Sequence, residues 1–186
     1  GLQTCKDCEK GHAINVTGAT ECDNCTSGKY NDGSTPTVCN VCPKGKFSFG
    51  NKISACEDCS EGRFGNATGL SSCFQCSPGF GQNEKGEESC TMCNPGFFQN
   101  VSGQSSCTEC SPGTYIGGQG HADEGCESCP LGRAQPSPGK ADCIDCGLEA
   151  STGRYSNAIG LVNCLLCPYG QYNDNSSASQ ACKECP

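Results

Sequence analysis

The residues best suited to chemistry in this chain are its cysteines, which number 22 among 186 residues and fall into eleven Cys-x-x-Cys pairs. Such pairs serve disulfide frameworks, zinc sites or thiol redox centres. Redox catalysis needs one perturbed thiolate in a supporting fold, which eleven equivalent pairs do not provide. Zinc ribbons need pairs that associate two by two around a metal, and an odd number of pairs disfavours this. Disulfides therefore remain, and we expect no metal and no cofactor.

The pairs recur at a nearly constant step along the chain. Six successive steps are 17 residues, and steps of 19, 17, 21 and 18 follow. A period this short predicts a repeat protein in which each unit is too small to bury a core alone and packs on its neighbours. The units begin at Cys5, Cys22, Cys39, Cys56, Cys73, Cys90, Cys107, Cys126, Cys143 and Cys164, with a partial unit from Cys182.

We expect residues 1–186 to form one continuous array of about ten repeats. The chain opens on Gly1 and stops just after a new repeat has begun. This indicates a fragment of a longer, processed protein.

Equivalence of the units limits how the cysteines pair, because a first cysteine must then bond a second cysteine. Joining the second cysteine of one unit to the first of the next closes a loop worth about 3 kcal/mol of unfolded-state restriction. The pairs would be Cys8–Cys22, Cys25–Cys39, Cys42–Cys56, Cys59–Cys73, Cys76–Cys90, Cys93–Cys107, Cys110–Cys126, Cys129–Cys143, Cys146–Cys164 and Cys167–Cys182. Cys5 and Cys185 are left over. The main alternative crosses two units, as in Cys5–Cys22 with Cys8–Cys25, and spacing alone leaves it open.

Glycines and aromatic residues keep a fixed phase in the repeat. A glycine stands three residues after the second cysteine, often behind a proline, which is a type II turn signal. We expect the aromatic residue two positions later to pack against a neighbouring disulfide. A second glycine, ten residues after the pair, predicts the return turn of a hairpin. The aromatic residues are Tyr30, Phe47, Phe64, Phe98, Tyr115 and Tyr172.

These features predict a small disulfide-rich repeat fold. We expect an elongated rod or solenoid of irregular β-hairpin units, each about 17 residues long, with little regular secondary structure and no helix of note. The ninth unit carries four extra residues, Gly147 to Ala150, and the register resumes at Gly153 with Tyr155 in the aromatic position.

Composition and charge exclude several classes of function. The net charge is −8 and no basic run occurs, which argues against nucleic acid. No apolar stretch is long enough to span a membrane. His12 and His121 each stand alone in polar stretches, and no serine has an accompanying base, so we predict that the protein is not an enzyme.

Asn-x-Ser/Thr acceptors predict N-linked glycans at Asn15, Asn66, Asn100 and Asn175. Asn15, Asn66 and Asn100 share one position, seven residues after the second cysteine, where asparagine also suits a turn. A fifth acceptor, Asn24, lies inside a Cys-x-x-Cys pair, where we expect shielding to make modification less favourable.

The stretches CSPGFGQNEKGEESC, CNPGFFQNVSGQSSC and CSPGTYIGGQGHADEGC resemble the ephrin-receptor-like cysteine-rich repeat. The chain looks more distantly like growth-factor-receptor (EGF-like) and tumour-necrosis-factor-receptor modules. Its uniformity is similar to that of protist surface antigens and of the shaft proteins of flagellar hairs (mastigonemes). The resemblance implies an extracellular, elongated array, and it specifies a fold more strongly than a partner.

We therefore expect an extracellular structural glycoprotein that forms or coats a surface filament or cell-surface layer. Its partners would be copies of itself or other surface or filament proteins, at the cell or flagellar surface. The alternative is a receptor stalk or a ligand-binding ectodomain of the cysteine-rich receptor type. If the array polymerises, apolar residues outside the packing positions should mark contacts: Ile14, Ile53, Leu70, Ile116, Leu148, Leu161, Val162, Leu165 and Leu166.

Overall fold

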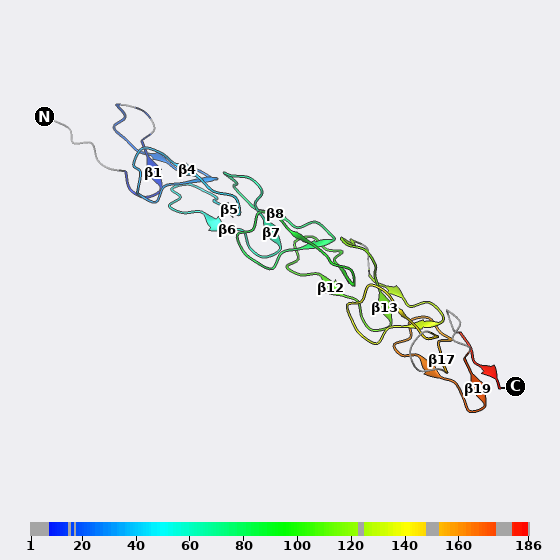
Figure 1. Ribbon diagram of the computed structural model, residues 1–186. Helices are drawn as coiled ribbons and strands as arrows, with labels where there is room; N and C mark the ends of the chain where they lie inside the picture. Colours follow the sequence, from blue (N-terminus) through cyan, green and yellow to red (C-terminus); the bar gives the residue numbers. More distant parts are fainter. Residues whose placement is uncertain are drawn as a thin grey trace. The chain divides into compact units, whose positions relative to one another are not determined.

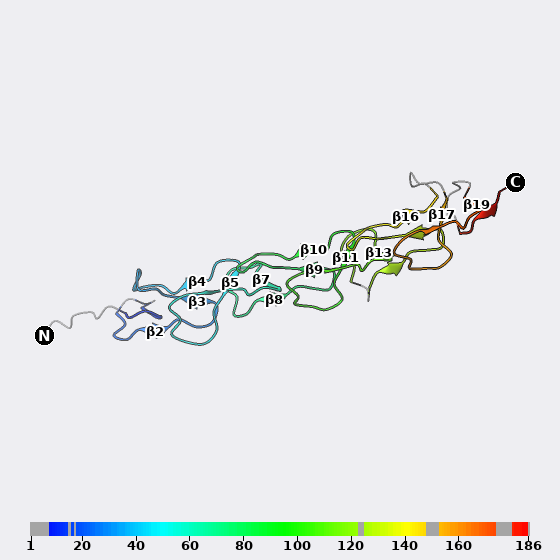
Figure 2. The same cartoon turned by 90° about the horizontal axis from the view of Figure 1, so that it is seen from below.

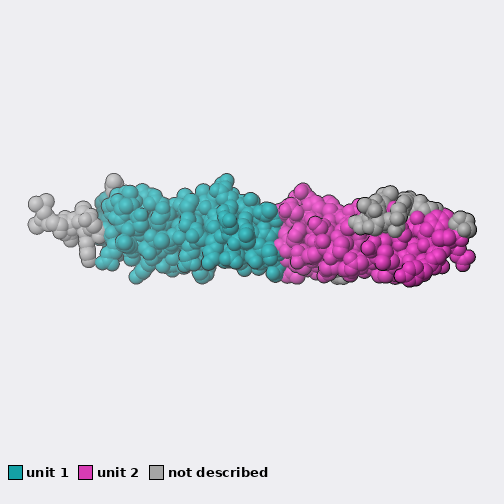
Figure 3. Space-filling view, turned by 60° about the horizontal axis from the view of Figure 1, so that its bottom comes forward, with its two compact units in different colours: residues 1–77, 81–91, 102–106 teal, residues 78–80, 92–101, 107–186 magenta. Residues whose placement is uncertain are grey.

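The computed structural model describes residues 8–14, 16, 18–122, 125–147, 153–173 and 180–185. The chain forms two compact units, coloured separately in Figure 3. Unit 1 comprises Gly1–Ser77, Gly81–Thr91 and Ser102–Ser106, and unit 2 comprises Pro78–Phe80, Met92–Val101 and Cys107–Pro186. No helix occurs in the described ranges. The prediction of a small disulfide-rich fold built from short hairpins is confirmed.

Short antiparallel pairs of strands are the regular secondary structure of the described residues (Figure 1). Each pair consists of two consecutive strands, each of two residues. The pairs are β1 (His12–Ala13) with β2 (Asp23–Asn24), β3 (Lys29–Tyr30) with β4 (Asn40–Val41), β5 (Lys46–Phe47) with β6 (Glu57–Asp58), β7 (Arg63–Phe64) with β8 (Phe74–Gln75), β9 (Phe80–Gly81) with β10 (Thr91–Met92), β11 (Phe97–Phe98) with β12 (Thr108–Glu109), β13 (Thr114–Tyr115) with β14 (Glu127–Ser128), β15 (Arg133–Ala134) with β16 (Ile144–Asp145), β17 (Arg154–Tyr155) with β18 (Leu165–Leu166), and β19 (Gln171–Tyr172) with β20 (Lys183–Glu184).

The second strand of each hairpin is the x-x dipeptide of the next Cys-x-x-Cys pair. In the fourth repeat, Arg63 lies opposite Gln75 and Phe64 lies opposite Phe74, with the ring centroids of the two phenylalanines 5.7 Å apart. Two-residue strands do not hold together alone in water. The Cys59–Cys73 disulfide closes this hairpin beside its strands.

Main-chain hydrogen bonds link each hairpin to the next one. The Gly62 amide donates to the Gln82 carbonyl (2.7 Å), and the Gly65 amide donates to the Glu87 carbonyl (2.9 Å), whereas the bond from the Cys76 amide to the Gly62 carbonyl (2.9 Å) extends the β7–β8 hairpin itself. Equivalent bonds recur from repeat to repeat in both units, where consecutive hairpins lie side by side in both views (Figure 1, Figure 2). Each repeat is therefore stabilised by its neighbours, as expected for a repeat protein.

The interior is built from disulfides. The second cysteines of the repeats from Cys8 to Cys146 are buried, whereas Ile116 is the one branched aliphatic side chain in the buried set of the described residues. This corrects the expectation that Ile116 is a surface contact. It occupies an interior position of its repeat and is 5% exposed.

A buried polar side chain six residues after the second cysteine completes the interior. Gln135 shows its role: its Nε2 donates to the Asp142 carbonyl (2.7 Å), and its Oε1 accepts from the Ser137 amide (3.1 Å). The side chain thus joins the two ends of the loop between β15 and β16. Buried polar groups are tolerated when they are hydrogen-bonded in this way. The position is filled by Asn31, Ser48, Gln82, Gln99, Gln135 and Asn173, and in the ninth repeat, which carries the four-residue insertion, by Ser156.

The first glycine of one repeat and the second glycine of the repeat two further along the chain lie in turns that contact each other. Gly62 has φ +73° and is the third residue of a turn closed by a hydrogen bond from the Arg63 amide to the Ser60 carbonyl (3.0 Å), as the type II signal predicted. A Cβ on Gly62 would lie 2.0 Å from the carbonyl oxygen of Gly103, the second glycine of a hairpin two repeats on. Gly103 lies in the loop between β11 and β12, where the return turn was predicted.

The ninth repeat regains the common register at Gly153. The Cys167 amide donates to the Gly153 carbonyl (2.7 Å), and Ser156 is buried at the polar position. Arg154 Nη1 donates to the Cys164 carbonyl (3.1 Å), just as Arg63 Nη1 donates to Cys73 (3.3 Å). Of the four inserted residues, Gly147 is described and is buried, while 148–150 lie outside the described residues.

Lys52 occupies the second-glycine position of the third repeat and has φ +60°, the one positive φ outside glycine in the described chain. We expect Lys52→Gly to raise the free energy of unfolding by about 1 kcal/mol, because left-handed backbone is costly for L-residues and not for glycine. Non-reducing guanidinium unfolding measures the change. Lys85→Gly, which removes an exposed lysine without positive φ, should instead lower stability; a loss in both variants would contradict the strain argument.

Candidate interaction surface

The structure joins the cysteines in a neighbour-to-neighbour ladder, in which the second cysteine of each repeat bonds the first cysteine of the next. Cys185 has an exposed free thiol, and Cys5 lies outside the described residues. The crossed arrangement is not present among these pairs. They are Cys8–Cys22, Cys25–Cys39, Cys42–Cys56, Cys59–Cys73, Cys76–Cys90, Cys93–Cys107, Cys110–Cys126, Cys129–Cys143, Cys146–Cys164 and Cys167–Cys182.

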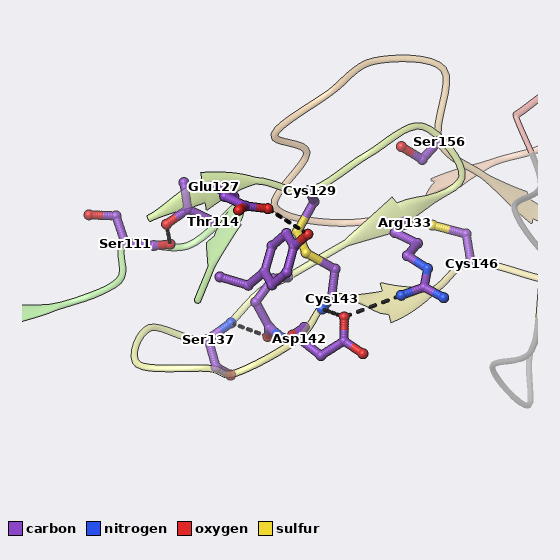
Figure 4. The surroundings of a disulfide bond; sticks show 12 residues. Ser111, Thr114, Glu127, Cys129, Arg133, Ser137, Asp142, Cys143, Cys146 and Ser156 are labelled. Carbon is purple, nitrogen blue, oxygen red and sulfur yellow. Dashed lines mark hydrogen bonds and ion pairs between the residues drawn. A yellow bond between two sulfur atoms is a disulfide. The ribbon is translucent and has the colours of Figure 1, made fainter. Parts of the chain in front are cut away.

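The surroundings of the Cys129–Cys143 disulfide are polar on the solvent side (Figure 4). Arg133 Nη1 lies 3.2 Å from Asp142 Oδ1, and that oxygen also accepts a hydrogen bond from the Cys143 amide (2.8 Å). The Tyr115 hydroxyl donates to Glu127 Oε2 (2.9 Å), and this hydrogen bond raises the pKa of the Tyr115 phenol. These contacts are exposed, so they position loops and contribute little to stability.

The structure describes three of the five predicted glycan acceptors, and all three are exposed. Asn66 and Asn100 are exposed at the start of their loops, directly after the buried interior position. Asn15 and Asn175 lie outside the described residues. Asn24 is exposed in β2, so the shielding expected from its place between two cysteines is absent: Asp23 and Asn24 form a strand in which both residues are exposed.

Asn24 also lines an open groove of about 570 Å³ in unit 1. The groove is mainly polar, with the Asp23 carboxylate and the Lys29 ammonium as its charged groups. Its lining comprises Ala13, Asp23, Asn24, Thr26, Lys29, Thr37, Val38 and Cys39. Its polar and charged side chains offer hydrogen-bonding and ionic groups to a partner.

The described residues bring together no group of three or more His, Cys, Asp or Glu side chains that could hold a metal ion. His12 Nδ1 lies 3.1 Å from the Lys10 carbonyl, and His121 Nε2 contacts the Gly117 carbonyl, so each histidine contacts its own turn. Within the same ranges, no helix is long and apolar enough to cross a membrane.

Exposed apolar side chains gather in the last repeats of unit 2. Leu166 is 66% exposed in β18, and Val162 and Leu165 are also exposed. Ile159 and Tyr169, which sequence analysis did not single out, are also exposed, and Tyr172, which it placed in the aromatic packing position, is 40% exposed. Ile14, Ile53, Leu70 and Leu161 are half-buried, and Leu148 lies outside the described residues.

Comparisons with known proteins agree with this architecture. Residues 82–122 match the family model described as tyrosine-protein kinase ephrin type A/B receptor-like. The chain is also similar to the sushi, von Willebrand factor type A, EGF and pentraxin domain-containing protein 1 of Rattus norvegicus and of Mus musculus. Each is 34% identical over 80 residues, which is 34% of this chain and 2% of the relative. The chain thus spans a small fraction of the length of these relatives.

The family match and the ladder of disulfides together support tandem ephrin-receptor-like cysteine-rich repeats of about 17 residues. The protein is a cysteine-rich repeat protein similar to receptor-like ectodomains. Disulfides persist in oxidising compartments, so this density of disulfides indicates a secreted or cell-surface protein.

Proposed function

We propose that this chain is an extracellular structural glycoprotein whose repeats build a rod that forms or coats a filament or surface layer. The proposal rests on the contacts that the fixed positions of the repeat make. The buried cysteines, glycine turns and main-chain hydrogen bonds of each hairpin make contacts with the hairpins before and after it. Contacts of this kind extend an array one repeat at a time.

A ligand-binding ectodomain or receptor stalk is the second candidate. Two observations favour it: the match of residues 82–122 to receptor-like repeats, and the polar groove around Asn24 and Lys29. In this case the array would hold a binding surface away from a membrane, and the partner would be another extracellular protein. Receptor modules bind through surfaces grafted on such folds, so the repeat itself does not choose between the two candidates.

Electron microscopy of the non-reduced, glycosylated protein tests the structural proposal. Under the proposal, negatively stained particles are thin rods or filaments of regular width. Small-angle scattering should then give a radius of gyration well above that of a compact chain of equal length, roughly 16 Å by the usual scaling for 186 residues. Compact particles would contradict it. Reduction should abolish the extended particles, since the repeats lack an aliphatic core.

N-linked glycans at Asn15, Asn66, Asn100 and Asn175 complete the proposal, with Asn24 a weaker acceptor in spite of its exposure. Enzymatic removal of N-glycans in heavy-oxygen water marks each occupied asparagine by mass spectrometry. We expect Asn66 and Asn100 to be occupied, because both lie exposed in loops. Asn83, which holds the same position without a following Ser or Thr, is the matched control and should stay unmarked. Unmodified Asn66 and Asn100 in secreted protein would contradict the prediction.

A further inference from the structure

The disulfides create a covalent path along the chain that is much shorter than the chain itself. From Cys73 this path runs through one exposed dipeptide to Cys76, crosses the disulfide to Cys90, and continues through the next dipeptide. Residues 77–89 lie beside the path, in a loop that the disulfide closes. The same arrangement recurs at every disulfide of the ladder, so most residues of the chain lie in closed loops beside the path.

The two kinds of step on this path have definite lengths. A Cys-x-x-Cys segment spans about 11 Å at full extension, since each residue adds about 3.6 Å. The Cα atoms of Cys76 and Cys90 are 5.8 Å apart across their disulfide. Each repeat therefore contributes about 17 Å to the path, against about 61 Å for 17 residues without a disulfide. From Cys8 to Cys182 the path reaches about 155 Å, about a quarter of the length available to the same residues once reduced.

The dipeptide segments of the path are already extended in the folded chain. Between Cys22 and Cys167, each of them forms the second strand of a hairpin, and a strand rises about 3.3 Å per residue, close to the limit. Tension therefore adds little length within these segments. It acts instead on contacts between repeats, such as the hydrogen bond from the Gly103 amide to the Cys76 carbonyl, because Cys76 lies on the path.

The loops beside the path have hydrogen bonds of their own. In the loop that the Cys129–Cys143 disulfide closes (Figure 4), the Gln135 side chain joins the Ser137 amide to the Asp142 carbonyl. Gln82 makes a corresponding pair of bonds within its own loop. Both partners of each bond lie on the same side of the disulfide, so tension along the path does not pull them apart.

We propose that this chain is a mechanical tether, in which tension follows the disulfides and the exposed strands while the hairpin loops carry none. This function goes beyond the structural role proposed above, because a filament protein and a receptor stalk would both use it. The loops hold the exposed glycan acceptors Asn66 and Asn100. A surface built on such loops keeps its fold while the tether is under load.

The tether also survives proteases that cut after lysine or arginine. Between Cys8 and Cys182, every lysine and arginine lies inside a closed loop, and none lies in a dipeptide on the path. Lys52, Lys85 and Lys140 are exposed in their loops and are the natural points of cleavage. A cut loop remains attached at both ends through its two cysteines, so the covalent path stays unbroken.

Two cleavages of the oxidised chain test the path in bulk. Trypsin is applied in urea until a reduced sample shows fragments; under denaturing, non-reducing conditions the same sample should remain one covalent body. Cyanogen bromide cleaves after Met92, the one methionine of the chain, which lies on the path in β10. It should divide the chain in two without reduction. Met92→Leu is the matched control and should stay whole.

Optical tweezers measure the length that tension extracts from the chain. Handles are ligated enzymatically to both ends of a Cys5→Ala, Cys185→Ala variant, which prevents thiol exchange. With its disulfides intact, the stretch from Cys8 to Cys182 should not exceed about 155 Å, and the trypsin-cut chain should hold the same load at the same length. A reductant added under tension should lengthen the uncut chain in steps of about 45 Å at disulfides such as Cys76–Cys90. It should break the trypsin-cut chain.

Two outcomes overturn the tether: an oxidised chain that lengthens well beyond about 155 Å, or a trypsin-cut chain that separates before reduction. Crossed disulfides would give both, because Arg63 would then lie on the path between two modules. Electron microscopy keeps the structural proposal separate. Thin rods that lengthen freely would retain the rod and remove the tether, whereas compact particles that keep to the length limit would remove the rod and retain the tether.

Discussion

Gly62→Ala is expected to lower the free energy of unfolding by about 3 kcal/mol, a large effect for one methyl group. Positive φ costs an L-residue roughly 1–2 kcal/mol, and forcing extra volume into a packed contact costs about 1–3 kcal/mol more. Gly62 incurs both costs, because its φ is +73° and a Cβ would lie 2.0 Å from the Gly103 oxygen. That oxygen belongs to main chain and cannot rotate away, so the whole turn must shift.

Amide hydrogen exchange locates the expected damage. The Gly103 amide donates to the Cys76 carbonyl (2.8 Å), and this bond must lengthen if the turn shifts. Faster exchange at Gly103 is therefore expected, together with a lower midpoint in non-reducing guanidinium followed by tyrosine fluorescence, since the chain has no tryptophan. In a repeat protein such an effect remains local to the neighbouring repeats.

Gly170→Ala is the matched control, because Gly170 holds the same position in the tenth repeat with φ +79°. No described atom lies within 4 Å of its Cβ position. Alanine there should cost only the conformational part, about 1–2 kcal/mol. Equal losses in the two variants would mean that the contact between the Gly62 and Gly103 turns contributes nothing to stability.

The spacing of residues was sufficient to predict the class of fold, because the constant spacing of the cysteine pairs gives the repeat period directly. The position of Gly153 in the ninth repeat could also be predicted, since the stretch after the insertion matches that after Gly62 in the fourth repeat. Turn geometry followed from glycine for a steric reason: few other residues accept positive φ. Lys52 shows the limit of that rule, since it adopts φ +60° at a glycine position.

Other features depend on contacts that the sequence does not display. Gln135 and Asn31 are polar and would ordinarily be placed at the surface, yet both are buried and close their own loops by hydrogen bonds. Ile116 occupies the same interior position. Its apolar side chain lies outside the packing positions that the sequence reveals, so the sequence predicted a surface contact there. A one-dimensional period also does not reveal that Gly62 touches Gly103 two repeats on, because phase does not determine which repeats meet.

Removing the Cys76–Cys90 disulfide is the second change with a large expected effect. Replacing both cysteines by alanine should lower the free energy of unfolding by about 3 kcal/mol, the value for releasing a loop of about 15 residues. Cys76 is fully buried, so the loss of its sulfur adds a packing cost. The substitutions are best made in a Cys185→Ala background, which removes the exposed free thiol and should itself leave stability unchanged.

The same double variant distinguishes the ladder from a crossed arrangement through its thiol count. In the ladder, Cys76 and Cys90 bond each other, so their joint replacement frees no thiol. In a crossed two-repeat module, Cys76 would bond Cys93 and Cys90 would bond Cys73, so two thiols would appear. Maleimide labelling of the unfolded, unreduced chain should therefore add no label over the Cys185→Ala background. Two added labels would overturn the ladder, in which each disulfide closes one hairpin beside its strands.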